Sequence, residues 1–108
     1  MTGYVLSGDA DEDLQDIYDY TERTWGERQA EGYIFALYGT FDLLASNPEA
    51  GRSRSDIREG LRSFPHRSHL VFYMRWEDEI AIVRVLNGAR DYERLFDDYD
   101  PVLGIMGR

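Results

Sequence analysis

Two segments of this chain gather the side chains that are able to bind or transform an anion. Residues 56–75 carry four arginines, two histidines and a tyrosine, and residues 80–91 add Arg84, Asn87 and Arg90. Arginine stabilises a phosphate or pairs with a carboxylate through two parallel hydrogen bonds, but it hardly ever releases its proton. These residue types therefore predict a surface that recognises phosphate or carboxylate groups.

Acid–base catalysis at a phosphate needs more than cations, because one group must accept a proton and another must donate one. The chain has no lysine and no cysteine, and the amide of Asn87 does not exchange protons near neutral pH. His69 remains as a general base with an ordinary pKa of about 6.5. Together with Arg62, Tyr73 and Arg84 it forms a small set of residues that could take part in catalysis.

The two histidines do not predict a metal site. His66 and His69 lie three residues apart, so on a strand they would project to opposite faces, and no acid stands near them. We expect His69 to be a hydrogen-bonded strand residue, and we expect neither a metal nor a cofactor.

The chain is strongly acidic, with a net charge of −9. Six acids and no base occupy residues 9–19, which we interpret as the solvated start of a helix. This balance argues against broad affinity for nucleic acid. No apolar run is long enough for a signal peptide or a membrane span. Residues 1–108 therefore predict one intracellular, cytoplasmic domain without a membrane partner.

Two helices are expected to position the N-terminal half of the chain. Residues 4–7 read as a short strand, and Asp9 with Glu12 forms a capping-box pattern that opens a helix ending at Gly26. A second apolar stripe predicts a helix over residues 27–46, which the following Asn-Pro pair ends. Two helices joined by so short a link must form a hairpin.

Three further strands are expected at residues 60–64, 69–76 and 79–87, after a polar loop at residues 51–56. The strand over residues 69–76 is apolar on both faces, so we place it at the centre of the sheet. The fold class is therefore α+β, with a mainly antiparallel sheet and the helix hairpin packed on one face. Residues 92–108 are expected to form a short helix and a loose tail.

Alternation along the strands divides their side chains between two faces. We expect Leu70, Phe72, Met74 and Trp76 to pack beneath the hairpin, together with Ala81, Val83 and Val85. The opposite, open face would then carry Arg62, Phe64, His69, Tyr73, Arg75, Ile82 and Arg84. Arg84 stands among aliphatic residues, and two interpretations stay open: pairing with an acid inside the domain, or binding an acidic partner.

The chain also resembles the ParE toxins of the RelE/ParE superfamily. The resemblance covers residues 4 to about 91 and is specific through the order and spacing of its motifs. The matching segments are Y-V-L-S at 4–7, D-L-Q-D-I at 13–17, T-W-G at 24–26, N-P-E-A-G at 47–51, I-R-E-G-L-R at 57–62, H-L-V-F-Y at 69–73 and I-V-R-V-L-N-G-A-R-D at 82–91.

This resemblance implies the toxin of a type II toxin–antitoxin module. Such a toxin inhibits or poisons DNA gyrase and is neutralised by a ParD-like antitoxin, which has a ribbon-helix-helix domain and forms a hetero-oligomer with the toxin. We expect the target or antitoxin interface to use Arg58, Arg62, Phe64, His69, Tyr73, Arg75, Arg84, Asn87 and Arg90. The aromatic excess on the helices predicts a groove for an antitoxin helix at Tyr18, Trp25, Tyr33 and Leu37.

Two other functions fit the same fold. One is a ribosome-dependent messenger RNA endonuclease of the RelE type, and the other is an interaction domain that has lost toxicity. Family members often carry histidine where this chain has Asn87. Since that position lacks a titrating side chain and the chain lacks lysine, we expect no catalytic residue, and an inhibitor rather than an enzyme.

Overall fold

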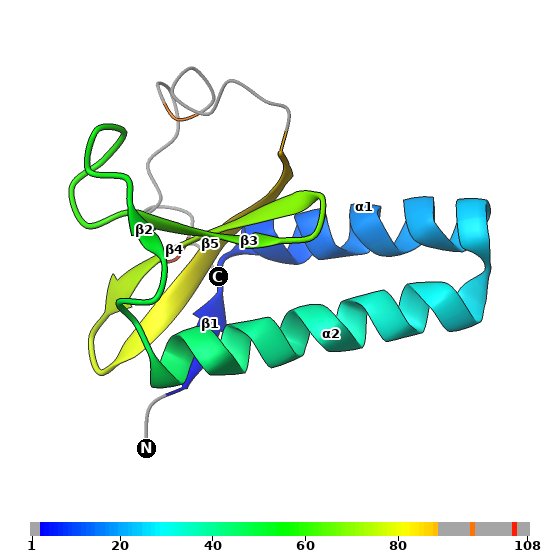
Figure 1. Ribbon diagram of the computed structural model, residues 1–108, viewed down its shortest axis with the longest axis horizontal. Helices are drawn as coiled ribbons and strands as arrows, with labels where there is room; N and C mark the ends of the chain where they lie inside the picture. Colours follow the sequence, from blue (N-terminus) through cyan, green and yellow to red (C-terminus); the bar gives the residue numbers. More distant parts are fainter. Residues whose placement is uncertain (1–2, 89–95, 97–104, 106–108) are drawn as a thin grey trace.

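A five-stranded sheet and a helix hairpin make up the part of the chain described here, residues 3–88, 96 and 105 of a computed structural model (Figure 1). Along the chain the elements are β1 (Tyr4–Leu6), α1 (Gly8–Trp25), α2 (Glu27–Ser46), β2 (Arg52–Ser53), β3 (Arg62–His66), β4 (His69–Trp76) and β5 (Glu79–Asn87). The predicted α+β class and the order of its elements are confirmed.

The strands lie in the order β1-β5-β4-β3-β2, so β4 is central, as predicted. β1 runs parallel to β5, and the other neighbouring pairs are antiparallel. The segment expected to be a polar loop contains the two-residue strand β2. The strand expected at residues 60–64 begins instead at Arg62, because Gly60 has a φ of +85° and belongs to a turn.

The start of α1 differs from the predicted capping box. Ser7, not Asp9, caps the helix: its hydroxyl oxygen accepts a hydrogen bond from the backbone N–H of Ala10 at 3.0 Å. The same hydroxyl donates to the carbonyl oxygen of Val83 at 2.8 Å. Ser7 follows β1 directly and so reaches both the helix and β5, which leaves Asp9 inside the first turn.

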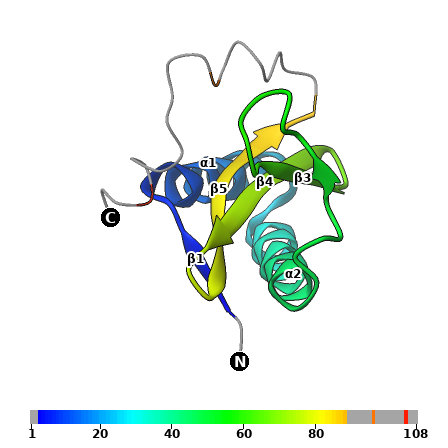
Figure 2. The ribbon, with the colours of Figure 1, turned by 90° about the vertical axis from the view of Figure 1, so that its left-hand side faces the viewer.

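The hairpin depends on one residue, Gly26. Its φ of +97° is open to glycine and strained for other residues, and it both ends α1 and precedes α2. The predicted bounds of the second helix, Glu27–Ser46, are confirmed. In Figure 1 the turn of the hairpin extends beyond the sheet, and Figure 2 looks almost along α2 with the strands in front.

The helices cover the face of the sheet opposite to the one predicted. Val71 and Tyr73 of β4 pack against the helices, in a buried cluster that includes Leu37 and Phe41. Of the residues predicted to lie beneath the hairpin, Val85 belongs to this helix-side cluster, as predicted. The others, Leu70, Phe72, Met74, Trp76, Ala81 and Val83, belong to or pack against a second cluster on the other face, which also includes Leu61, Leu86, Phe96 and Ile105. The error arises because both sets of alternating residues in β4 are apolar, so the pattern does not say which set meets the helices.

The second face of the sheet is therefore not open at its centre. Phe72 is fully buried there, with the Arg54 guanidinium 6.0 Å from its ring centre. Phe96 and Ile105 are each only 7% exposed in this cluster, so the expectation of a loose tail is wrong at Ile105. The rest of the C-terminal helix and tail expected over residues 92–108 lies outside the described residues. Among those that are described, no helix is both long and apolar enough to cross a membrane.

Tyr73 connects the central strand to the chain that follows α2. Its side chain is 1% exposed, and its hydroxyl donates to the carbonyl oxygen of Pro48 at 2.8 Å and accepts from the N–H of Gly51 at 2.7 Å. A Cβ added at Gly51 would lie 2.5 Å from this hydroxyl oxygen. Tyr73 is thus a structural residue, and its predicted place on an exposed interface is wrong.

Tyr73→Phe should lower the free energy of unfolding by about 1–3 kcal/mol, because the buried N–H of Gly51 loses its acceptor. Urea denaturation measures the change. Tyr20→Phe is the matched control, since the Tyr20 side chain is exposed, and its effect should stay within about 0.5 kcal/mol. Equal effects of the two variants would contradict the structural role.

Candidate functional site

A cleft of about 750 Å³ lies between the helix hairpin and the end of the sheet. One wall comes from α1 and the start of α2, and the other from the β3–β4 turn and the end of β5. We call it the hairpin cleft; its lining includes Asp13, Asp16, Ile17, Tyr20, Thr21, Trp25, Gln29, Tyr33, Arg67, Ser68, His69, Arg84, Val85, Leu86 and Asn87.

The helical wall of the cleft exposes large aromatic side chains. Trp25 is 69% exposed and Tyr20 is 54% exposed. Tyr33 of α2 is partly buried deeper in the cleft. Clustered exposed aromatic surface is typical of a protein-binding site, because it gains most from being covered. The predicted aromatic surface of the helices is thus present.

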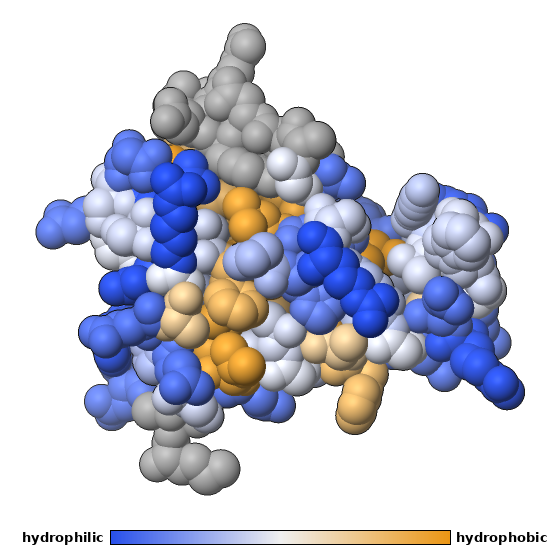
Figure 3. Space-filling view, in the orientation of Figure 1, coloured by the Kyte–Doolittle hydropathy of each residue, from blue (hydrophilic) through white to orange (hydrophobic). Residues whose placement is uncertain are grey.

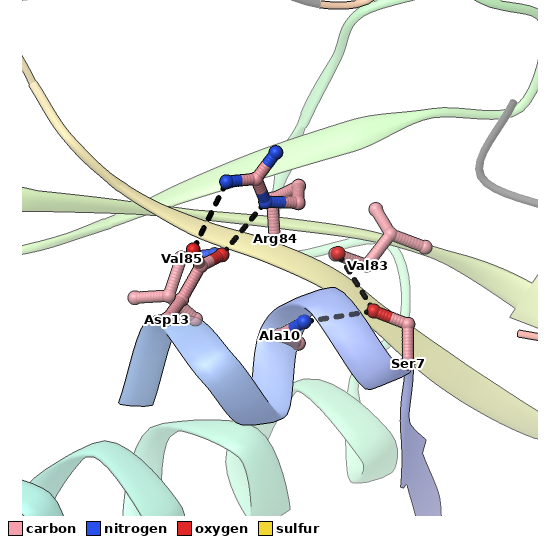
Figure 4. A network of polar contacts seen from close by, with 6 residues as sticks. All are labelled: Ser7, Ala10, Asp13, Val83, Arg84 and Val85. Atoms are coloured by element: carbon pink, nitrogen blue, oxygen red, sulfur yellow. Dashed lines mark hydrogen bonds and ion pairs between the residues drawn. The ribbon is translucent and has the colours of Figure 1, made fainter. Parts of the chain in front are cut away.

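An ion pair between Asp13 of α1 and Arg84 of β5 joins the two walls of the cleft (Figure 4). The Asp13 carboxylate accepts hydrogen bonds from Arg84 Nε at 2.8 Å and Nη2 at 3.0 Å. It also accepts a hydrogen bond from the backbone N–H of Val85 at 2.9 Å. The Asp13 side chain thus bonds to the edge of β5 at a point beyond the end of β1. Of the two open interpretations of Arg84, pairing inside the domain is therefore the one observed.

A β-bulge explains why the position of Arg84 could not be read from alternation. Tyr73 pairs with Ile82 whereas Phe72 pairs with Arg84, so Val83 is an extra residue in β5. An extra residue bends the strand and changes the direction of the side chains that follow it. Regular alternation would place Val83 and Val85 on one face, as predicted, whereas the extra residue leaves Ile82 and Val85 on the helix side and Val83 and Leu86 on the other.

His69 lines the cleft, and His66 lies beside it at the other end of the β3–β4 turn. His69 Nδ1 lies 2.7 Å from the hydroxyl of Tyr33, and His66 Nδ1 lies 2.8 Å from that of Thr40. Burial, and then the neighbouring His66, lower the pKa of His69 against the opposing effect of Asp13. Burial and the nearby Arg67 lower the pKa of His66. The expectation of a hydrogen-bonded His69 is confirmed.

Arg67 is the exposed cation of this wall. It occupies the β3–β4 turn with a φ of 55°, and its guanidinium carbon lies 5.6 Å from the ring centre of Tyr33. Stacking on an aromatic face holds a guanidinium in place while its hydrogen-bond donors stay accessible. Arg67 is thus positioned to meet a carboxylate that enters the cleft.

The structure brings together only part of the predicted interface. Trp25, Tyr33, His69, Arg84 and Asn87, which were predicted on two separate surfaces, line the one cleft. The remaining described residues of the prediction lie elsewhere: Tyr18, Leu37, Arg58, Arg62, Phe64, Tyr73 and Arg75. Arg90 lies outside the described residues.

Several of those residues have structural roles. Leu37 is completely buried, so its predicted place in an exposed groove is wrong. Arg62 donates to the carbonyl oxygen of Gly51 at 2.7 Å, and Phe64 packs on the helix-side core, so neither lies on an open sheet face. Arg75 is exposed next to the end of α2, in a different shallow pocket.

Among the cleft residues that were not predicted from the sequence, Asp13 and Arg67 form its main charged contacts. Asp13 shares a helix strip with Ile17 and Tyr20 at spacings of four and three, a signal that was available but hidden among the neighbouring acids. Arg67 comes after the end of the expected strand, in a turn. The sequence does not indicate in which direction a turn residue projects its side chain. Within the described residues, no group of three His, Cys, Asp or Glu side chains is placed to hold a metal ion.

Comparison with known proteins identifies what the chain is similar to. Residues 4–92 match the family described as "ParE toxin of type II toxin-antitoxin system, parDE". Toxin ParE1 of Mycobacterium tuberculosis (strain CDC 1551 / Oshkosh) is 40% identical over 92 residues, which are 84% of this chain and 94% of the relative. Toxin ParE1 of Caulobacter vibrioides is 39% identical over 87 residues, 81% of this chain and 90% of the relative.

A solved structure has the same fold. The structure titled "Chromosomal ParDE TA system from P. aeruginosa" superposes with a TM-score of 0.69 and 23% sequence identity, and the match covers 81% of this chain and 96% of that chain. The family resemblance and the fold inferred from sequence motifs are thereby confirmed.

Asp13→Asn should destabilise the fold by about 1–3 kcal/mol, because the change removes the charge from three hydrogen bonds at the edge of β5. Asp16→Asn is the matched control: Asp16 lines the same cleft but is exposed, and its loss should change stability by less than about 0.5 kcal/mol. Thermal or urea unfolding of both variants gives the comparison. A smaller loss for Asp13→Asn than for the control would contradict the role of the ion pair.

The histidines should make stability depend on pH. Their pKa values are lower in the folded protein, so between the folded and unfolded values the unfolded chain binds more protons and stability rises with pH. Acidification below about pH 6.5 should therefore remove stability, down to the folded pKa values. The double change of His66 and His69 to glutamine should flatten this part of the curve. An unchanged slope would contradict the assignment.

Proposed function

Because this chain belongs to the ParE family of toxins from type II toxin–antitoxin systems, we propose that it arrests growth by inhibiting DNA gyrase in the cytoplasm. We further propose that a ParD-like antitoxin neutralises it by laying a C-terminal helix into the hairpin cleft. The observation that carries the second step is the exposed aromatic wall of Tyr20 and Trp25 opposite the accessible guanidinium of Arg67.

The two walls of the cleft suit an amphipathic helix with carboxylates along one side. Its apolar anchors would cover Tyr20 and Trp25, since exposed aromatic rings gain most from burial at an interface. A carboxylate on its other side would pair with Arg67, which is exposed and already oriented by Tyr33. Arg84 would contribute mainly through shape, because Asp13 already binds it.

We propose that inhibition is not catalytic. The Nδ1 atom of His69 is engaged with the Tyr33 hydroxyl, and its strand neighbour across the ladder is Asn87, which cannot transfer a proton. The nearby arginines stabilise charge but do not act as bases. One observation favours the alternative of an RNA-cleaving enzyme, namely that His69, Tyr33 and Arg67 lie side by side. The experiment below separates the two.

Purified protein should slow supercoiling of plasmid DNA by gyrase and leave ribosome-bound messenger RNA intact. His69→Gln should fold and keep this inhibition, because we assign His69 no chemical step. Messenger RNA cleavage that His69→Gln abolishes would overturn both the target and the non-enzymatic mechanism. If the protein neither slows supercoiling nor cleaves messenger RNA, and its induction does not arrest growth, it is an interaction domain without toxicity.

The same assay tests the cleft. The antitoxin encoded beside the toxin should restore supercoiling, and Trp25→Ser should weaken its binding by about 30-fold or more, as expected for a central aromatic anchor. Leu43→Ser is the matched control, an exposed apolar residue of α2 outside the cleft, and its affinity should stay within about threefold. Equal binding by both variants would place the antitoxin elsewhere.

A further inference from the structure

The face of α2 that is turned away from the core carries an exposed stripe. Phe35 at its centre is 80% exposed, more than Trp25 or Tyr20 in the hairpin cleft. In Figure 3 a weakly hydrophobic protrusion stands on the lower edge of the molecule, over the middle of α2. The exposed residues that follow this line are Arg28, Gly32, Phe35, Gly39, Asp42 and Ser46. Their spacing alternates between four and three, the spacing by which one helix packs along another.

Two glycines flank Phe35 on this stripe, and the fold itself does not require them. A Cβ added at Gly32 or at Gly39 would meet no other atom within 4 Å. Glycine inside a helix costs about 1 kcal/mol relative to alanine, because it loses more conformational freedom. What a missing Cβ does provide is a hollow into which another side chain or backbone fits. The stripe thus combines one ridge with two hollows.

We propose that this stripe, Arg28 to Ser46 of α2, is the contact of a homodimer in which the α2 helices of two copies pack antiparallel. A two-fold axis places the same surface on both sides, so the surface must complement itself. Here the ridge and the hollows belong to one helix. Antiparallel packing centred on Phe35 sets the two Phe35 side chains beside each other, flanked by Gly32 and Gly39 of both copies. The proposal does not depend on the function proposed above.

Charge favours the same arrangement. Arg28 lies near the start of the stripe and Asp42 near its end, and both side chains are exposed. Antiparallel packing brings Arg28 of each copy close to Asp42 of the other, at both ends of the contact, whereas parallel packing would bring like charges together. The stripe carries one charge of each sign, so it matches a second copy better than a strongly acidic or basic partner.

The hairpin cleft stays accessible in this dimer, because none of the stripe residues lines it. The contact uses one face of a 20-residue helix, which is about 30 Å long. The area that one helix face can bury is smaller than that of a standard interface, which is roughly 1,600 Å². We therefore expect association in the micromolar range.

Sedimentation equilibrium of the full chain, from low micromolar concentration upward, tests the proposal. The chain should dimerise, and Phe35→Ser should weaken dimerisation at least tenfold without lowering the melting temperature. Tyr20→Ser, at an exposed aromatic position of α1 outside the stripe, should leave dimerisation unchanged within threefold. A monomer at every concentration, or a dimer that tolerates Phe35→Ser, would overturn the proposal.

Two further sets of variants separate this contact from general stickiness. Gly39→Leu should maintain or raise the melting temperature through its better helix propensity, and still weaken dimerisation at least tenfold by filling the hollow. Arg28→Asp and Asp42→Arg should each weaken dimerisation, and the double variant should restore it to within threefold of the original. Failure of the double variant to recover, or tight dimers of Gly39→Leu, would rule out the antiparallel contact.

Discussion

The carboxylate of Asp13 is the contact on which the arrangement of the molecule depends. β1 ends opposite Ile82, and past that point no described strand gives the edge of β5 a backbone partner. Asp13 supplies one by accepting the N–H of Val85, and its second bond, to Arg84, removes the cost of an arginine among aliphatic residues. The helix hairpin is thereby tied to the sheet at the place where the cleft opens.

The helices could be predicted closely because their boundaries are set by local chemistry. Gly26 permits a backbone conformation that other residues avoid, and the proline after Asn47 ends the second helix, so neither boundary depends on distant contacts. The central place of β4 likewise follows from its own apolar composition. Composition does not say which face of the sheet meets the helices, because both faces of β4 are apolar. That choice depends on all the residues that pack against each face.

The candidate site, too, could be predicted from the sequence only in part. Exposed aromatic residues such as Trp25 could be anticipated, since two helices cannot bury so many large rings. The bulge at Val83 could not, because one extra residue in a ladder leaves no mark in the composition of the strand. That extra residue shifts the register of Arg84 and of the residues after it, which places Val85 on the helix side.

The parallel pairing of β1 with β5 also has a consequence for how the protein is made. The hydroxyl of Ser7 reaches the carbonyl oxygen of Val83, so the first strand and the cap of the first helix are completed by the last strand. During synthesis the helix hairpin can form early, from contacts close in sequence, whereas β1 must wait for β5 to be translated. Until β5 has been translated, the nascent chain therefore lacks the sheet wall of the hairpin cleft.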